Sequence, residues 1–128
     1  MQDGQWDNKM KVVQKTWGHE LWIVNNDLYC GKQLFVRKNR TSSEGRFHYH
    51  KIKDETFFIL TGVLQLEFYT DEAKPSHSQS RQLSMGDVFH VPPLMRHRFS
   101  AIHRDCRFIE FSTHHEDSDS YYEGARYE

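Results

Sequence analysis

Three histidines and one glutamate are the residues of this sequence best suited to chemistry. His48 and His50 form a His-x-His pair, Glu55 follows after four residues, and His97 stands about forty residues further on. Alternate residues of a strand point to the same face, so the paired histidines can reach one ion while Tyr49 points away. Three neutral imidazoles and one carboxylate suit Mn, Fe, Co, Ni or Zn, and they leave one or two coordination positions for water or substrate. The pattern therefore predicts one divalent transition metal held on strands.

The spacing around these residues resembles the two sequence motifs of the cupins. Six residues separate Glu55 from Gly62, so the run that begins at His48 resembles the first motif, His-x-His, three or four residues, Glu, six residues, Gly. From Gly86, five residues lead to Pro92, and the lone histidine stands five further on, as in the second motif. The resemblance covers roughly residues 30 to 112. It implies an all-β fold, the cupin jelly roll or double-stranded β-helix barrel.

The sequence departs from the cupin motifs at three positions that are not ligands. Ser42 stands where a glycine would precede the histidine pair, Leu94 replaces the glycine of the second motif, and Ala101 replaces its final asparagine. Leucine does not adopt positive φ cheaply, so these departures bear on the shapes of the turns around the site. The four expected metal ligands are untouched.

The remaining histidines are expected to lie outside the metal site. His103 and the pair His114 and His115 stand among charged residues, which is typical of solvated loops. As a histidine, His103 could serve as an acid or base. Nothing in the sequence brings it to the metal.

Short apolar runs bounded by turn residues predict an all-β domain. Short strands at close spacing are typical of a sandwich or barrel. Gly62 is expected to form a hairpin turn between two long strands, and residues 70–82 are expected to form a polar loop without chemistry. No long helix is expected. The expected strands are 20–25, 33–37, 55–60, 63–69, 88–91 and 106–111.

Length and charge favour one compact cytoplasmic domain. The 128 residues suit a single cupin domain over 1–128, with a barrel core at about 19–113, a polar N-terminal arm and an acidic tail that is flexible or packed on a partner. The net charge of −1 gives no footprint for nucleic acid or an anionic membrane. No long apolar run or signal peptide is visible. Cys30 and Cys106 are expected to be buried, unpaired residues of a reducing compartment.

Several strands are apolar on both faces, which bears on oligomeric state. Phe57 and Ile59 alternate with Phe58 and Leu60, so one pair can line the barrel while the other needs cover from a second layer or another subunit. Cupins commonly pair through such faces. The resemblance therefore implies a homodimer, with the sandwich itself as the alternative cover.

A second resemblance concerns the reaction. The segment 15–20, followed by 30–32 and 48–55, is similar to small cupins related to phosphomannose isomerase and D-lyxose isomerase, and 109–117 is similar to the strand and acidic turn that close those domains. This resemblance implies an isomerase or epimerase that acts on a free or phosphorylated sugar. In such an enzyme the metal stabilises an enediolate while a base moves a proton between neighbouring carbons.

Candidate catalytic residues follow from strand parity and charge. Glu110 is the best base, because its parity on an entering strand can turn it inward, although a solvent-facing glutamate is the simple alternative. Lys32 and Lys53 are candidates to bind sugar hydroxyls or a phosphate. Arg96 and Arg98 flank the last ligand and are expected at the rim.

Two other functions share the same ligand set. A dioxygenase could bind Fe(II) or Mn at this site together with a chelating substrate and O₂. Its pocket would be apolar or would hold one cation, whereas sugar chemistry needs several polar side chains around the metal. A non-catalytic metal-binding or sugar-binding module is the third possibility, and it is favoured if Glu110, Lys32 and Lys53 all point outward.

Overall fold

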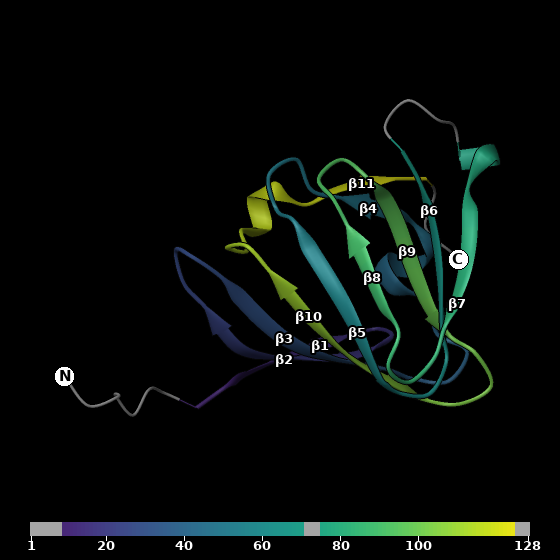
Figure 1. Ribbon diagram of the computed structural model, residues 1–128, viewed down its shortest axis with the longest axis horizontal. Coiled ribbons are helices and arrows are strands. Elements are labelled where there is room, and N and C mark those ends of the chain that lie inside the picture. Colours follow the sequence, from purple (N-terminus) through teal and green to yellow (C-terminus); the bar gives the residue numbers. More distant parts are fainter. Residues whose placement is uncertain (1–8, 71–74, 125–128) are drawn as a thin grey trace.

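The computed structural model of the protein describes residues 9–70 and 75–124. Over these residues the chain is built of antiparallel strands and three short 3-10 helices (Figure 1). No helix in the described ranges has the length and apolar character needed to cross a membrane. The strands are β1 (Lys11–Lys15), β2 (Gly18–Asn25), β3 (Cys30–Val36), β4 (Phe47–Tyr49), β5 (Glu55–Thr61), β6 (Leu64–Tyr69), β7 (Gln79–Leu83), β8 (Val88–Val91), β9 (Arg96–Ala101), β10 (Cys106–Ser112) and β11 (Tyr121–Glu123). The 3-10 helices are η1 (Ser42–Gly45), η2 (Pro75–His77) and η3 (Asp117–Asp119).

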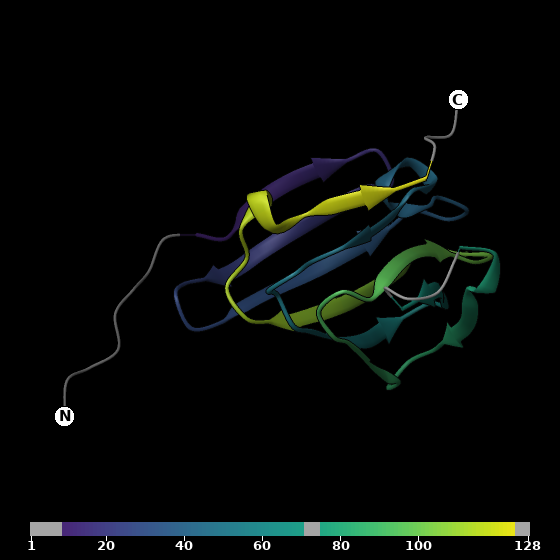
Figure 2. The same ribbon diagram turned by 90° about the horizontal axis from the view of Figure 1, so that it is seen from above.

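The strands form two sheets that pack face to face. One sheet has the order β1-β2-β3-β10-β5-β8, and the other has the order β11-β4-β9-β6-β7. Figure 2 shows the same strands from above. This is the all-β jelly-roll barrel that the sequence predicts. Both ligand-bearing strands of the small sheet, β4 and β9, are neighbours.

Alternating burial explains why these segments become strands. In β3 and β10, every second side chain is buried and the others are half-buried or exposed. Such a period of two points one set of side chains into the barrel. The inward residues form a single apolar cluster, which gathers Trp17, Leu34, Val36, Phe57, Ile59, Leu64, Leu66, Phe68, Leu83, Val91, Phe99, Ala101, Cys106 and Phe108. The cysteines at 30 and 106 are free and buried, as expected.

The turn at Gly62 is not a hairpin. The strands that it joins, β5 and β6, belong to different sheets, so the sequence-based expectation of a paired hairpin is wrong. Gly62 has φ of 80°, and a Cβ added there would lie 2.3 Å from the carbonyl oxygen of Asp105. The glycine therefore lets the chain cross from one sheet to the other against the strand that precedes β10.

The sheets extend beyond the limits expected from the sequence. β1 begins at residue 11 and β11 ends at residue 123, whereas the barrel core was expected at about 19–113. Within the expected loop 70–82, the structure places η2 and most of β7, which pairs with β6. Residues 71–74 of that loop lie outside the described ranges. Polar composition concealed β7, because four of its five residues face solvent.

The six-stranded sheet carries apolar side chains on its outer face. Phe57 and Ile59 point into the core, while Phe58 and Leu60 on the opposite face are half-buried. Further along the outer face of the same sheet, Phe111 is 56% exposed. Packing within the chain therefore covers only part of this face, and the homodimer stays a prediction.

Candidate metal centre

The four predicted ligands come together inside the barrel. His48 lies opposite His97 in the pairing of β4 with β9, and their ring centroids are 4.0 Å apart. His50 follows β4 directly, and the candidate ligand atoms of these three histidines all lie within 4.8 Å of one another. Glu55 begins β5 in the facing sheet, and its carboxylate oxygens lie 3.7 Å from His50 Nε2 and 3.3 Å from His97 Nε2. The histidine cluster could hold one metal ion.

The unpartnered atoms of these residues fit a metal better than they fit a closed polar core. His50 Nδ1 donates to the carbonyl oxygen of Asp119 at 2.9 Å, and His97 Nδ1 donates to that of Met95 at 3.0 Å. Each of these bonds leaves a lone pair on Nε2. Four buried atoms have no hydrogen-bond partner in the described structure: His48 Nδ1, His50 Nε2, Glu55 Oε2 and His97 Nε2. Buried polar atoms without partners are costly, and a shared cation would satisfy all four.

Burial favours the neutral form of His48 and His50. It lowers the pKa of His50 to about 4, and together with the neighbouring histidines it holds the pKa of His48 well below its ordinary value. Burial alone would raise the pKa of Glu55, but the charge of Lys53 and the contact with His97 outweigh it and hold this pKa well below its usual range. Neutral imidazoles and an ionised carboxylate are the forms that bind a metal.

Metal-free protein is expected to lose stability as the pH falls from 6.5 toward 4. In this window an unfolded histidine takes up a proton while His50, with a folded-state pKa of about 4, does not, so the unfolded state binds more protons. The free energy of unfolding should fall by on the order of 3 kcal/mol from His50 alone. Urea unfolding of chelator-treated protein at several pH values tests this. Parallel pH profiles for the wild type and His50→Gln would contradict it.

Leu94 adopts the positive φ that its side chain was expected to oppose. Its φ is 73°, so the turn has the shape that the cupin glycine would give. Two hydrogen bonds hold it, from Leu94 N to His50 O at 2.7 Å and from Arg96 Nη1 to Leu94 O at 2.8 Å. The side chain is 40% exposed and is not part of the apolar cluster. The turn thus ties the backbone after β4 to the strand that carries His97.

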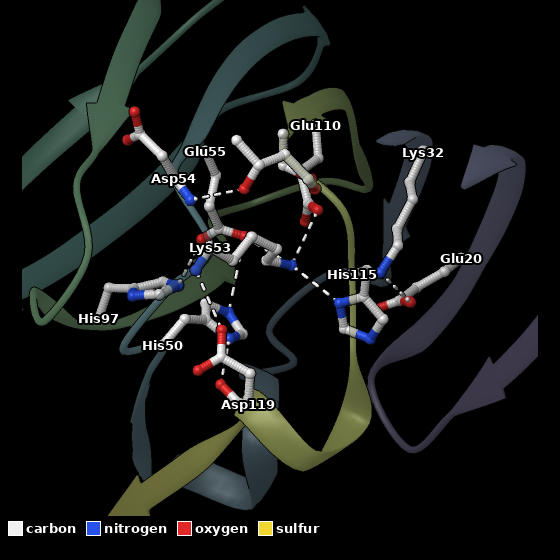
Figure 3. A network of polar contacts seen from close by, with 12 residues as sticks. Glu20, Lys32, His50, Lys53, Asp54, Glu55, His97, Glu110, His115 and Asp119 are labelled. Atoms are coloured by element: carbon white, nitrogen blue, oxygen red, sulfur yellow. Dashed lines mark hydrogen bonds and ion pairs between the residues drawn. The ribbon is translucent and has the colours of Figure 1, made fainter. Parts of the chain in front are cut away.

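A buried lysine links the metal cluster to a second carboxylate. Lys53 Nζ lies 3.0 Å from Glu55 Oε1, 3.1 Å from Glu110 Oε2 and 3.0 Å from His115 Nδ1 (Figure 3). The two carboxylates raise the pKa of Lys53 despite its burial, so the ammonium stays charged. Burial raises the pKa of Glu110, and Lys53 only partly offsets this. Glu110 and Lys53, which the sequence names as catalytic candidates, therefore lie together beside the metal cluster.

His115 belongs to this network, which corrects the expectation that it lies in a solvated loop. Its side chain is 9% exposed, and its ring packs edge-on against Trp22 at 5.0 Å. Because the Lys53 ammonium can only donate, His115 Nδ1 must accept, and Nε2–H donates to Asp117 Oδ1 at 2.8 Å. The similarity of 109–117 to a closing acidic turn was the available signal. His114 is 34% exposed, and His103 in its exposed turn lines no part of the cavity.

The acidic tail is part of the site, contrary to the expectation of a flexible or partner-packed end. β11 pairs with β4, and the yellow segment that contains η3 crosses the end of the barrel where β4 lies (Figure 1). The carboxylate of Asp119 accepts hydrogen bonds from the backbone N–H groups of Lys51, Ile52 and Lys53, with shortest distances of 3.0, 3.2 and 3.0 Å. The tail thereby fixes the turn that connects His50 to Lys53.

Replacing Asp119 with alanine is expected to loosen this turn. Three backbone N–H groups would lose their acceptor, which should lower the free energy of unfolding by about 2 kcal/mol. Metal affinity should fall about tenfold, because the turn and the carbonyl of residue 119 orient His50. Competition with a chromophoric chelator measures the affinity, and Asp105→Ala is the control, because Asp105 accepts from Lys38 N far from the cluster. Unchanged affinity in Asp119→Ala would contradict the orienting role.

One cavity of about 320 Å³ joins these groups. Lys32 projects into it from β3 and is 2% exposed. Arg96 and Arg98, expected at the rim, are not among its lining residues: they form ion pairs with Glu123 and Glu67. Strand alternation explains this, because residues on either side of His97 must face away from the interior.

A two-sheet antiparallel barrel with an internal histidine cluster is the architecture of the metal-binding jelly rolls. The family model described as Cupin matches residues 22–125, and the chain belongs to this family. No curated protein matches the sequence.

Solved structures share the fold at low sequence identity. The capsular polysaccharide assembling protein CapF from Staphylococcus aureus has 15% identity and a TM-score of 0.78, with 93% of this chain and 35% of CapF covered. Oxalate decarboxylase from Bacillus subtilis has 13% identity and a TM-score of 0.75, with 94% and 33% covered. KdgF from Halomonas sp. has 16% identity and a TM-score of 0.68, with 87% and 92% covered. The chain thus spans about a third of the length of CapF and of the decarboxylase.

Proposed function

We propose that this protein is a metal-dependent isomerase or epimerase of a free or phosphorylated sugar. The observation that carries the proposal is the buried Lys53–Glu110 pair, which shares a cavity with three of the four residues that carry unpartnered donor atoms. The four atoms belong to the proposed ligands His48, His50, Glu55 and His97. A divalent transition metal bound by them would supply a Lewis acid for two neighbouring substrate oxygens.

The residues around the cluster can move the proton that isomerisation requires. Glu110 takes a proton from the carbon beside a carbonyl and returns it to the neighbouring carbon on the same face, while a hydroxyl proton passes between the two substrate oxygens, so no other reactant is consumed. Epimerisation would require a second acid on the opposite face of the carbon. Its raised pKa brings it closer to the working pH, which suits a base that must also release the proton. Lys53 holds the carboxylate in place and balances its charge.

Pocket polarity favours sugar chemistry over oxygen chemistry. Besides Lys53 and Glu110, the lining contains Lys32, Glu20 and Arg46. Such a lining suits a substrate with several hydroxyl groups, whereas a thiol or diketone substrate favours an apolar pocket. CapF, which shares the fold, is described as a polysaccharide-assembling protein. At 15% identity this likeness supports the fold alone, so the substrate class rests on the pocket.

Proton exchange in D₂O tests the proposal. The protein is reconstituted in turn with Mn, Co, Ni, Zn and anaerobic Fe(II), and free and phosphorylated aldoses and ketoses are followed by NMR. Deuterium is expected beside the carbonyl, with a new sugar appearing, only when metal is present. No exchange with any of these sugars or with the matching sugar acids while metal is bound would exclude the proposal, and oxygen consumption with chelating substrates would then test the dioxygenase alternative.

A further inference from the structure

Lys32 is a buried cation whose hydrogen bonds are unused. Its ammonium lies over the ring of Trp22 at 4.2 Å, and the nearest carboxylate oxygen, Glu20 Oε1, is 3.8 Å away. That oxygen already accepts a hydrogen bond from Trp22 Nε1 at 2.8 Å. Among the described residues, Lys32 Nζ makes no hydrogen bond, although the side chain is 2% exposed and lines the cavity. A buried ammonium without an acceptor is costly unless a ligand supplies one.

The charge of the inner cavity favours a ligand with one negative charge. Two lysines and three glutamates of the inner cavity are buried or nearly buried, and their charges add up to one net negative charge. A divalent ion at the proposed ligands turns this into one net positive charge. An uncompensated charge in a site of low dielectric is unfavourable, and a monoanion removes it, whereas a phosphate dianion would overshoot. The residues counted are Lys32, Lys53, Glu20, Glu55 and Glu110.

The lysine is separated from the metal cluster along the large sheet. In the large sheet Lys32 is opposite Glu110, and Glu110 is opposite Phe57, so β10 separates Lys32 from the strand that carries Glu55. Figure 3 shows Lys32 beyond His115 when viewed from His50 and His97. A molecule that spans both positions must be longer than a two-carbon acid.

We propose that the substrate of this site is a sugar acid and that Lys32 binds its single carboxylate. The inference rests on the proposed function, since it assumes that the other end of the substrate is held at the metal. The Lys32 ammonium donates two or three hydrogen bonds to the carboxylate, and Glu20 sets how strongly the subsite attracts an anion. Neutral sugars leave Lys32 without an acceptor, and the excess positive charge remains.

Matched ligands that differ only at C6 test the proposal by binding. Glucuronate, glucose and glucose 6-phosphate, with the corresponding galacto and manno compounds, are titrated calorimetrically into the metal-loaded protein. In at least one series the acid is expected to bind about tenfold or more tighter than the sugar, the effect of one new hydrogen-bonded ion pair. Lys32→Met should abolish this preference, and Glu20→Gln should strengthen acid binding about threefold.

Two controls separate the carboxylate subsite from general effects. Lys38→Met removes an exposed lysine outside the cavity and should leave the preference unchanged. Metal-free protein, with one net negative charge in the cavity, should bind the acids weakly. Melting temperatures establish that Lys32→Met is folded. Glu20→Gln is an independent test, because it should strengthen acid binding where Lys32→Met weakens it.

The outcomes distinguish this inference from the proposed function. Neutral sugars or phosphate esters that bind as tightly as the acids in every series, or a preference that survives in Lys32→Met, would overturn the carboxylate subsite. Metal-dependent proton exchange of a neutral aldose that is as fast as that of the matched acid would overturn the subsite and leave the isomerase. Acid binding that requires Lys32, without any proton exchange, would support the subsite and exclude the isomerase.

Discussion

Substituting alanine for His97 is expected to remove most of the bound metal, with affinity reduced about 100-fold or more. His97 is fully buried, and its Nε2 is one of the four unpartnered donor atoms. Loss of one of four ligands removes a direct bond to the ion, which costs more than the tenfold to 100-fold loss typical of supporting residues. His50→Ala should behave alike. Elemental analysis after dialysis and chelator competition measure the loss.

His90→Ala is the matched control for these variants. His90 is an exposed histidine of β8 that pairs with Asp54 at 2.6 Å and does not line the cavity. Its replacement should leave metal content unchanged. The apolar cluster does not include the proposed ligands, so circular dichroism should show that His97→Ala retains the barrel. Full metal content in folded His97→Ala or His50→Ala would show that the site assignment is wrong.

The metal cluster could be predicted from the sequence because its geometry is local. His-x-His places two imidazoles on one face of a strand by pleating alone, and His48 and His50 both line the cavity. Parity also predicted the inward direction of Glu110 on β10. The proximity of β4, β5 and β9 depends on contacts between distant parts of the sequence. It could be predicted only from the resemblance to the cupin spacing.

Contacts made by polar, irregular segments could not be predicted in this way. His115 and Asp119 lie in a run of charged residues whose composition is typical of a solvated tail. Their burial depends on partners distant in the sequence, namely the Lys53 ammonium and the N–H groups of 51–53. The prediction of a hairpin at Gly62 was wrong for the same reason, because a residue with positive φ can form either a hairpin or a crossing between sheets. At Gly62 the sequence therefore indicates the shape of the turn but not which strand pairs with which.

Lys53 connects the metal cluster to the proposed base and to the C-terminal tail. Its ammonium has three hydrogens, and three acceptors surround it, on Glu55, Glu110 and His115. A metal ligand, the proposed base and the C-terminal tail therefore share one cation. Asp119 holds the turn that carries Lys53, and the Lys53 ammonium contacts the Glu110 carboxylate. The position of the tail therefore affects the charge next to Glu110. Of the three groups around Lys53, Glu110 is the one whose replacement should affect proton exchange most directly.

Replacing Glu110 with glutamine should abolish proton exchange while metal remains bound. The amide keeps the size of the side chain and can still accept from Lys53, but it cannot take a proton from carbon. General base catalysis contributes about 10² to 10⁴ in rate, so the exchange rate with the substrate should fall by about 10³. Metal content should stay near that of the wild type, because Glu110 is not among the four unpartnered atoms.

The matched control for this variant is Glu67→Gln, which removes a carboxylate that pairs with Arg98 and does not line the cavity. It should exchange protons at the wild-type rate. A KM near the wild-type value in Glu110→Gln, with the loss confined to kcat, would indicate that Glu110 acts on the reacting carbon. If exchange persists in metal-loaded Glu110→Gln within about tenfold of the wild-type rate, the base must be another residue, and His115 then becomes the group to test.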